Sequence, residues 1–327
     1  MRPALVFLAV CLSCLADPTL LVAATKHGAK LNSRPVIGIL TQEISYQLKE
    51  LYPGPYNAYL AASYVKFIEG AGARVAPIWL GQTEAYYEDI LGKVNGVLLP
   101  GGAAWFNVTN GYAESAEKIY NIATRLNTNG DYFPIWGTCL GFEVLLYIAS
   151  NRKDYRFDCS SKNRAVPLEL TNDYRKSRLF RNASENLVNV LETENVTWNY
   201  HRFCFNKQSL REAQISEDYR VMSYNRDESN KKFISTLEHV THPFYGVQFH
   251  PEKNAYEWRP GKNVPHTQNA IQVSQYFANF FVNEARKNQH SFHNKSEENA
   301  ALIYNYPATF TGQKGASYDV CYLFEKR

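Results

Sequence analysis

A cysteine between two glycines is the residue of this chain best suited to nucleophilic chemistry. A short apolar run leads into Gly137-Thr138-Cys139-Leu140-Gly141, and a helix-like segment, 142–149, follows at once. This is the pattern of a nucleophile elbow, in which a strand turns sharply into a helix and presents the central residue. Only glycine tolerates the close backbone approach on both sides of such a turn. We expect Cys139 at a helix N-terminus, where the dipole and free N–H groups favour a thiolate.

A histidine and a glutamate far downstream are suitable partners for this cysteine. The apolar, β-prone run 245–249 is followed by His250-Pro251-Glu252, and the proline ends the strand just past the histidine. We expect His250 to accept and return the proton of Cys139. Glu252 is placed to orient the imidazole or to stabilise its charged form, as the third group does in Ser-His-Asp sites.

A glycine-rich turn supplies candidate donors for an oxyanion. The hydrophobic run 96–99 ends in Pro100-Gly101-Gly102. Backbone N–H groups from Gly101 and Gly102, together with that of Leu140, predict an oxyanion hole. Each motif alone also occurs in buried cores and ordinary turns. Their order, each at the end of a predicted strand, favours a catalytic site.

The elements around the motifs alternate between strand-like and helix-like patterns in the first half of the chain. We predict strands at 36–41, 74–79, 96–99 and 133–136, and helices at 57–69, 83–93 and 112–127. This alternation predicts right-handed βαβ units, and so an α/β fold with a mostly parallel central sheet flanked by helices. Catalytic loops lie beyond the carboxyl ends of such strands, where Gly101, Cys139 and His250 fall.

The second half of the chain is less regular. Strand-like segments at 166–170, 196–201, 219–224 and 233–238 predict antiparallel additions to the sheet. The run 245–249 returns to the central sheet, a long helix is expected at 268–287, and 288–327 is expected as an extension packed on the domain. The catalytic domain is therefore predicted to span 34–287.

The three motifs together resemble the class I glutamine amidotransferase-like superfamily. Within it, the segments Trp136 to Glu143 and Gly246 to Lys253 are similar to those of the γ-glutamyl hydrolase family, which acts on folate polyglutamates. The resemblance runs from about Arg34 to the C-terminus. It implies a flavodoxin-like sheet and a cysteine-dependent hydrolase that cleaves γ-glutamyl bonds of folate and antifolate poly-γ-glutamates through a thioester. It implies no cofactor, and a homodimer is left open.

Three more residues enter through the resemblance. Glu143 lies one helical turn after Cys139 and so on the same helix face. His201 and Tyr59 match family positions concerned with substrate binding or catalysis, although a histidine in a strand is more often structural. Two other functions stay open: a glutaminase acting on another γ-glutamyl amide, and a non-catalytic folate-binding glycoprotein.

The N-terminus indicates entry into the secretory pathway. Arg2 is followed by an apolar stretch from Ala4 to Ala16, which predicts a signal peptide within 1–24, cleaved after Ala16 or after Ala24. Four Asn-x-Ser/Thr sequons support this assignment and predict surface glycosylation. They begin at Asn107, Asn182, Asn195 and Asn294. We therefore expect a lysosomal or extracellular protein that does not span a membrane.

The remaining composition argues against other classes of protein. Beyond the predicted signal the chain keeps Cys139, Cys159, Cys204 and Cys321, too few for a disulfide scaffold. If Cys139 is free, at most one pair forms among the other three, and the sequence does not say which. No zinc-type Cys/His spacing is present, so no metal site is expected. The chain has a formal net charge of +4 with interspersed charges, which gives nucleic-acid binding little support.

Overall fold

A mixed eight-stranded sheet organises the protein, for which a computed structural model describes residues 30–326. Five neighbouring strands are parallel, and three antiparallel strands extend the sheet at one edge. In spatial order these are β4 (Arg74–Ile78), β1 (Val36–Leu40), β5 (Val97–Leu99), β6 (Ile135–Thr138), β12 (Phe244–Val247), β11 (Lys232–His239), β10 (Tyr219–Arg226) and β8 (Glu169–Leu170). The predicted α/β class, with a mostly parallel centre and antiparallel additions, is confirmed.

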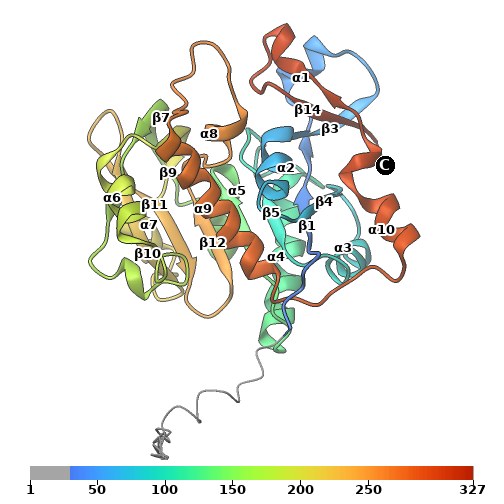
Figure 1. The fold of residues 1–327 in the computed structure, drawn as a ribbon, viewed down its shortest axis with the longest axis horizontal. Coiled ribbons are helices and arrows are strands. Elements are labelled where there is room, and N and C mark those ends of the chain that lie inside the picture. Colours follow the sequence, from blue (N-terminus) through green and yellow to red (C-terminus); the bar gives the residue numbers. More distant parts are fainter. Residues whose placement is uncertain (1–29, 327) are drawn as a thin grey trace, which may run out of the picture. The chain divides into compact units, whose positions relative to one another are not determined.

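Helices cover both faces of this sheet because each presents one apolar side to it. One face packs against α2 (Ala62–Glu69), α6 (Glu185–Thr193) and α9 (Gln268–Ala285). The other packs against α3 (Glu84–Leu91), α4 (Tyr112–Thr128) and α5 (Leu140–Ala149). Helices α2 and α9 lie against each other in front of the sheet in Figure 1. The two apolar cores hold the sheet rigid between helical layers.

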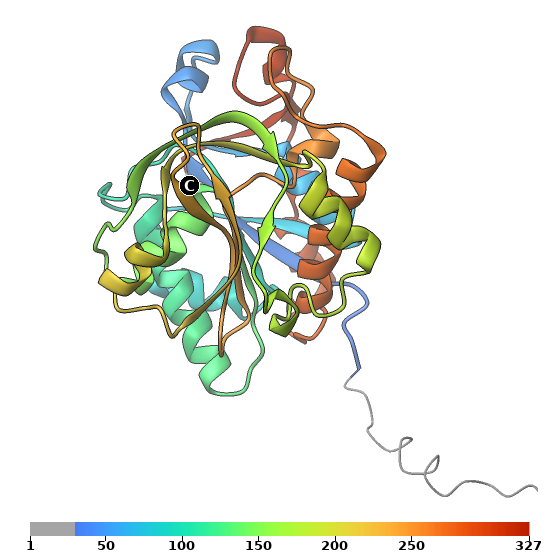
Figure 2. The same cartoon turned by 90° about the vertical axis from the view of Figure 1, so that its left-hand side faces the viewer.

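A two-stranded ribbon lies beside the antiparallel half of the sheet (Figure 2). It pairs β7 (Phe157–Val166) with β9 (Thr197–Cys204), and a disulfide between Cys159 and Cys204 joins the two strands. Cys321 is buried and free, which answers the pairing question that the sequence left open. Helix α7 (Lys207–Glu212) follows the ribbon.

Strands near the C-terminus pair with strands from residues 42–61. A second sheet runs in the order β13 (Ala308–Thr309), β14 (Cys321–Glu325), β3 (Tyr56–Ala61) and β2 (Gln42–Glu43). The pairing of β14 with β3 packs the predicted extension onto the main unit. The short helices are α1 (Tyr46–Leu51), α8 (Lys253–Tyr256), α10 (Lys295–Ala301) and 3-10 turns at Tyr174–Lys176, Ile303–Asn305 and Thr311–Lys314. Within residues 30–326 no helix combines the length and apolar content needed to cross a membrane.

One predicted helix begins later than expected, and one strand of the ribbon was not predicted. The helix predicted at 57–69 begins only at Ala62, because the preceding residues form β3 and pair with β14 from the opposite end of the chain. Of strand β7, only the last residue was predicted to be in a strand. The strand is largely polar, and it is held in place by its pairing with β9 and by the disulfide. The predicted signal peptide lies outside the described residues.

The elbow at Cys139 is present as the sequence predicted. Strand β6 ends at Thr138, α5 begins at Leu140, and Cys139 between them has φ 51° and ψ −107°. A Cβ on Gly137 would lie 2.6 Å from the carbonyl oxygen of Gly141, and one on Gly141 would overlap the carbonyl oxygen of Leu99. Such a backbone conformation for a non-glycine residue stores strain that the surrounding packing must sustain.

Replacing Gly141 by alanine should therefore destabilise the fold. The added methyl meets backbone rather than a flexible side chain, and overpacking of this kind costs about 1–3 kcal/mol. Gly92→Ala is a matched control, since its φ is −68° and its Cβ would lie 3.4 Å from the nearest atom. Urea unfolding of both variants measures the difference. Equal stabilities for the two would contradict the packing described for the elbow.

Candidate active site

The parallel strands bring the three sequence motifs to one edge of the sheet. In register, Leu99 of β5 lies opposite Gly137 of β6, and Thr138 lies opposite Val247 of β12. The N–H of Cys139 continues this pairing by donating to the Val247 carbonyl at 2.8 Å. Each motif begins where its strand ends, so the three loops meet beyond the carboxyl edge, as α/β sheets arrange their ligand sites.

Gly101 is the point on which the reacting groups converge. A Cβ at this position would lie 3.0 Å from Cβ of Cys139, 2.8 Å from Cε1 of His250 and 2.7 Å from the hydroxyl of Tyr64. Any side chain at Gly101 would therefore fill the space between the thiol and the imidazole. The glycine is required here for close approach, since its φ is not positive.

His250 is held by a buried carboxylate on one ring nitrogen. Its Nδ1 lies 2.8 Å from Oε1 of Glu252 and 3.4 Å from the Tyr64 hydroxyl, and its backbone N–H donates to the Trp198 carbonyl. With Nδ1–H donating a hydrogen bond to the Glu252 carboxylate, Nε2 is the ring nitrogen that remains for the thiol. Burial opposes ionisation of Glu252, but His250 and Lys253 hold the pKa of its carboxyl below the usual value. The carboxylate can thus orient and stabilise an imidazolium.

The pKa of the Cys139 thiol is higher than the sequence suggested. Burial raises the pKa of Cys139 well above its ordinary value, and the carboxylates of Glu143 and Glu252 raise it further. The Leu140 N–H and the charge of Lys253 act in the opposite direction without overcoming these effects. The N–H at the helix N-terminus thus favours the thiolate as expected, but burial and the two carboxylates outweigh it and the pKa of the thiol is raised. Cys139 needs His250 to take its proton at the moment of attack.

The predicted oxyanion donors differ in their surroundings. The Leu140 N–H points at the sulfur of Cys139, as its effect on the thiol pKa indicates. The Gly101 N–H donates to the Tyr64 hydroxyl at 2.8 Å, so it is occupied in this structure. Gly102 lines the pockets on both sides of Cys139. The arrangement favours Leu140 and Gly102 as the pair that faces a developing oxyanion.

Glu143 is a buried, paired carboxylate. One oxygen accepts from Arg156 at 2.8 Å, and the other accepts from the Gln248 amide at 3.1 Å. Burial raises the pKa of its carboxyl, although the Arg156 guanidinium opposes this. Glu143 lines the space next to Cys139.

His201 is buried and neutral. Its Nε2 lies 3.1 Å from Oδ1 of Asn199, its Nδ1 lies 3.1 Å from the Phe203 carbonyl, and burial lowers the pKa of its imidazole to about 3. Among the described residues, only His201, Cys159 and Cys204 group three side chains with metal-ligand geometry. The two sulfurs are joined in the disulfide and offer no thiolate to a cation.

Tyr59 supports the glycine-rich turn from behind. Its hydroxyl donates to the Gln42 side chain at 3.0 Å, and the Gln42 amide donates to the Pro100 carbonyl at 3.1 Å. Tyr59 also lines the pocket in front of Cys139. Its hydrogen bonds thus help to fix the loop that carries Gly101.

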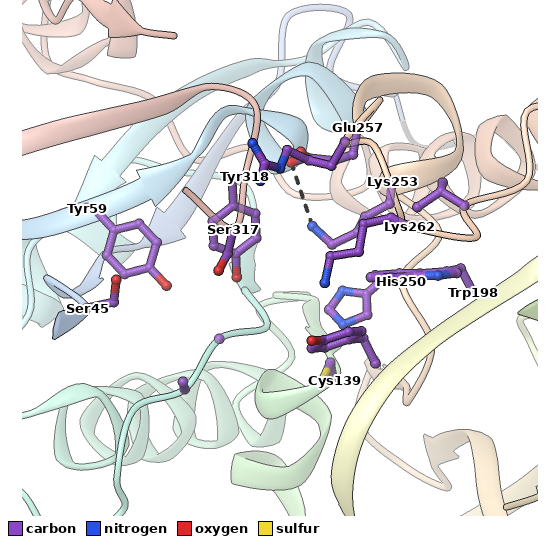
Figure 3. A pocket seen from close by; sticks show the side chains of 15 residues that line it. Ser45, Tyr59, Cys139, Trp198, His250, Lys253, Glu257, Lys262, Ser317 and Tyr318 are labelled. Atoms are coloured by element: carbon purple, nitrogen blue, oxygen red, sulfur yellow. Dashed lines mark ion pairs between the residues drawn. The ribbon is translucent and has the colours of Figure 1, made fainter. Parts of the chain in front are cut away.

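Two pockets meet at Cys139. The first, the lysine pocket, is shown in Figure 3 and is lined by His250, Trp198, Tyr318, Lys253, Arg259 and Lys262. The second, the Arg156 pocket, is lined by Leu140, Glu143, Arg156, Lys162, His201 and Phe203. Gly102, Ala103, Cys139 and Tyr200 belong to both. A substrate whose scissile carbonyl lies at Cys139 can therefore extend in two directions.

Sequence reasoning missed several residues of this site. Tyr64 contacts both Gly101 and His250, but in the sequence nothing distinguishes it from the other buried residues of α2. Trp198 and Tyr318 reach the site from β9 and from the C-terminal extension, elements whose place in the fold the sequence did not fix. Lys253 was missed too, although its position directly after the His-Pro-Glu motif could have indicated that it lies at the site.

Alkylation by iodoacetamide should modify Cys139 and spare Cys321, since Cys139 lines two pockets and Cys321 is completely buried. Because alkylation needs the thiolate and the pKa of Cys139 is raised, the rate should keep rising as pH increases above about 8.5, the ordinary thiol value. Peptide mapping after timed labelling measures both. A rate already at its plateau at pH 7 would show a depressed pKa instead.

The comparisons with known proteins agree with this geometry. Residues 35–252, which contain all three motifs, match the family described as Peptidase C26. The chain is 41% identical over 312 residues to the Gamma-glutamyl hydrolase of Rattus norvegicus, covering 95% of this chain and 94% of the relative. It is 39% identical to that of Homo sapiens, covering 96% and 98%, and 37% identical to Gamma-glutamyl hydrolase B of Dictyostelium discoideum, covering 86% and 80%. The chain therefore belongs to the Peptidase C26 family.

Proposed function

We propose that this protein is a cysteine hydrolase that cleaves γ-glutamyl bonds through a thioester, with folate poly-γ-glutamates as substrates. The observation that carries the proposal is the convergence of Cys139 and the buried His250–Glu252 pair on Gly101. The relatives named Gamma-glutamyl hydrolase span almost the whole chain and supply the bond type.

Acylation begins with the neutral thiol. Nε2 of His250 takes the proton of Cys139 as the sulfur attacks the γ-carbonyl of the substrate. The N–H groups of Leu140 and Gly102 face the oxygen on which negative charge develops; one such donor typically lowers the barrier by about 3 kcal/mol. Glu252 stabilises the imidazolium that forms.

Collapse of the intermediate and deacylation reuse the same histidine. The imidazolium of His250 gives its proton to the leaving nitrogen, the C–N bond breaks, and the γ-glutamyl group stays on Cys139 as a thioester. Water then enters, loses a proton to His250 and hydrolyses the thioester. The two carboxylates near the sulfur favour return of the proton to Cys139, which resets the site.

The function is tested with paired substrates. Poly-γ-glutamates should be cleaved, and the α-linked glutamate peptides of equal length should react more slowly by on the order of 100-fold, because an α-peptide bond misplaces the carbonyl. Product analysis by mass spectrometry, with free glutamine as a third substrate, separates a hydrolase of chains from a glutaminase. Comparable rates on the γ- and α-linked chains would refute the bond preference.

Two variants accompany that experiment as controls. Cys139→Ala should abolish turnover and leave thermal stability close to that of the parent, because the small side chain fills little core volume. His250→Asn should lower kcat by roughly 10²–10⁴-fold, the usual contribution of general acid–base catalysis. Binding of a folate polyglutamate by the inactive Cys139→Ala protein would exclude a loss of folding as the reason for its inactivity.

We further propose that the protein enters the secretory pathway and acts in lysosomes or outside the cell. The support is the signal-like N-terminus and the exposure of all four sequon asparagines. Protein made in animal cells should lack the first sixteen or twenty-four residues, and glycosidase should increase its gel mobility. An intact N-terminus together with unchanged mobility would overturn this assignment.

A further inference from the structure

The two pockets at Cys139 are chemically different, and this difference gives the substrate a direction. His250 lines the lysine pocket and not the Arg156 pocket, whereas Leu140 and Glu143 line only the latter. The group that protonates the leaving nitrogen must stand on the side to which the amine departs. On the proposed mechanism, the leaving amine therefore lies in the lysine pocket and the acyl portion in the Arg156 pocket.

Lys262 brings an uncompensated charge to the lysine pocket. Its ammonium lies 3.8 Å from the centre of the Tyr200 ring, and no carboxylate of residues 30–326 lies within ion-pair distance of it. Figure 3 shows its side chain, like that of Lys253, directed into the space beside His250. An ammonium held against an aromatic face at a pocket wall is placed to meet an anion from the pocket side.

Lys253 and Arg259 add donors that are already removed from water and unused. The Lys253 ammonium is buried, lies 4.3 Å from the Tyr318 ring, and makes no hydrogen bond although Glu252 and Glu257 are 3.8 and 3.6 Å away. The Arg259 guanidinium donates to two backbone carbonyls, but its buried Nε–H has no partner. A buried donor without a hydrogen bond costs free energy unless a ligand satisfies it.

The wall of the lysine pocket carries more positive than negative charge. This wall carries three cations, Lys253, Arg259 and Lys262. Only two carboxylates, Glu252 and Glu257, lie near them, and Glu252 already pairs with His250. The balance is positive on the side where the amine leaves. A neutral or cationic leaving group would gain nothing from these residues, whereas a carboxylate would pair with them.

We propose that the lysine pocket binds the carboxylates of the departing glutamate, so that the enzyme selects its leaving group by charge. This inference rests on the proposed function. The C–N bond breaks, the sulfur of Cys139 takes the acyl carbon, and the thiol proton passes through His250 to the nitrogen of an amine whose carboxylates contact Lys262 and Lys253. A glutamate or a γ-linked glutamate tail is the leaving group that fits.

The experiment compares two γ-glutamyl substrates that differ only in the leaving amine, glutamate in one and its uncharged diamide in the other. The unmodified protein should prefer the glutamate-leaving substrate in kcat/KM by roughly 10–100-fold, the usual value of a charge-assisted contact. Lys262→Met should remove about a factor of ten from that preference, and Lys262→Arg should restore it. Lys162→Met is the matched control, because Lys162 lines only the Arg156 pocket, and it should keep the full preference.

Each outcome decides between the two proposals. Equal cleavage of both substrates by the unmodified protein would overturn the leaving-group inference and leave the γ-glutamyl hydrolase function standing. If neither substrate is cleaved, the function itself fails. A Lys262→Met protein that loses the same factor on both substrates would show that the residue only supports the structure, which also contradicts the inference.

Discussion

The parallel hydrogen bonding of β5, β6 and β12 is the constraint on which the site depends. It sets Leu99 opposite Gly137 and Thr138 opposite Val247, so that segments far apart in the chain end at the same edge. The backbone of the elbow is also tightly packed, because a side chain at Gly137 or Gly141 would collide with backbone atoms. A shift of one residue in any of the three strands would separate the thiol from its base.

This crowding also determines the chemistry. Burial beside Glu143 and Glu252 raises the pKa of the Cys139 thiol. The reactivity must therefore come from proton transfer to His250 during the reaction rather than from a resting thiolate. The carboxylate of Glu252, whose pKa is lowered, prepares the imidazole for that charge.

Local patterns in the sequence were sufficient for the parallel centre of the fold and for the positions of Cys139, His250 and Glu252, because each motif follows a strand whose pattern is self-contained. The elements that local patterns did not predict depend on pairing between segments far apart in the chain. Strand β3 depends on β14, and β7 depends on β9 and the disulfide. For the same reason Tyr64, Trp198 and Tyr318 were missed, since their approach to the site is set by the packing of distant elements. The thiol pKa was misjudged because the sequence does not show burial.

Partitioning of the acyl group between water and hydroxylamine tests the covalent route through Cys139 most directly. Two γ-glutamyl substrates with different leaving amines but the same acyl portion form one common thioester if the account is correct. The ratio of hydroxamate to free acid, measured by mass spectrometry at a fixed hydroxylamine concentration, should then be identical for both. A ratio that changes with the leaving amine would mean that water attacks the substrate directly, and it would contradict a thioester on Cys139.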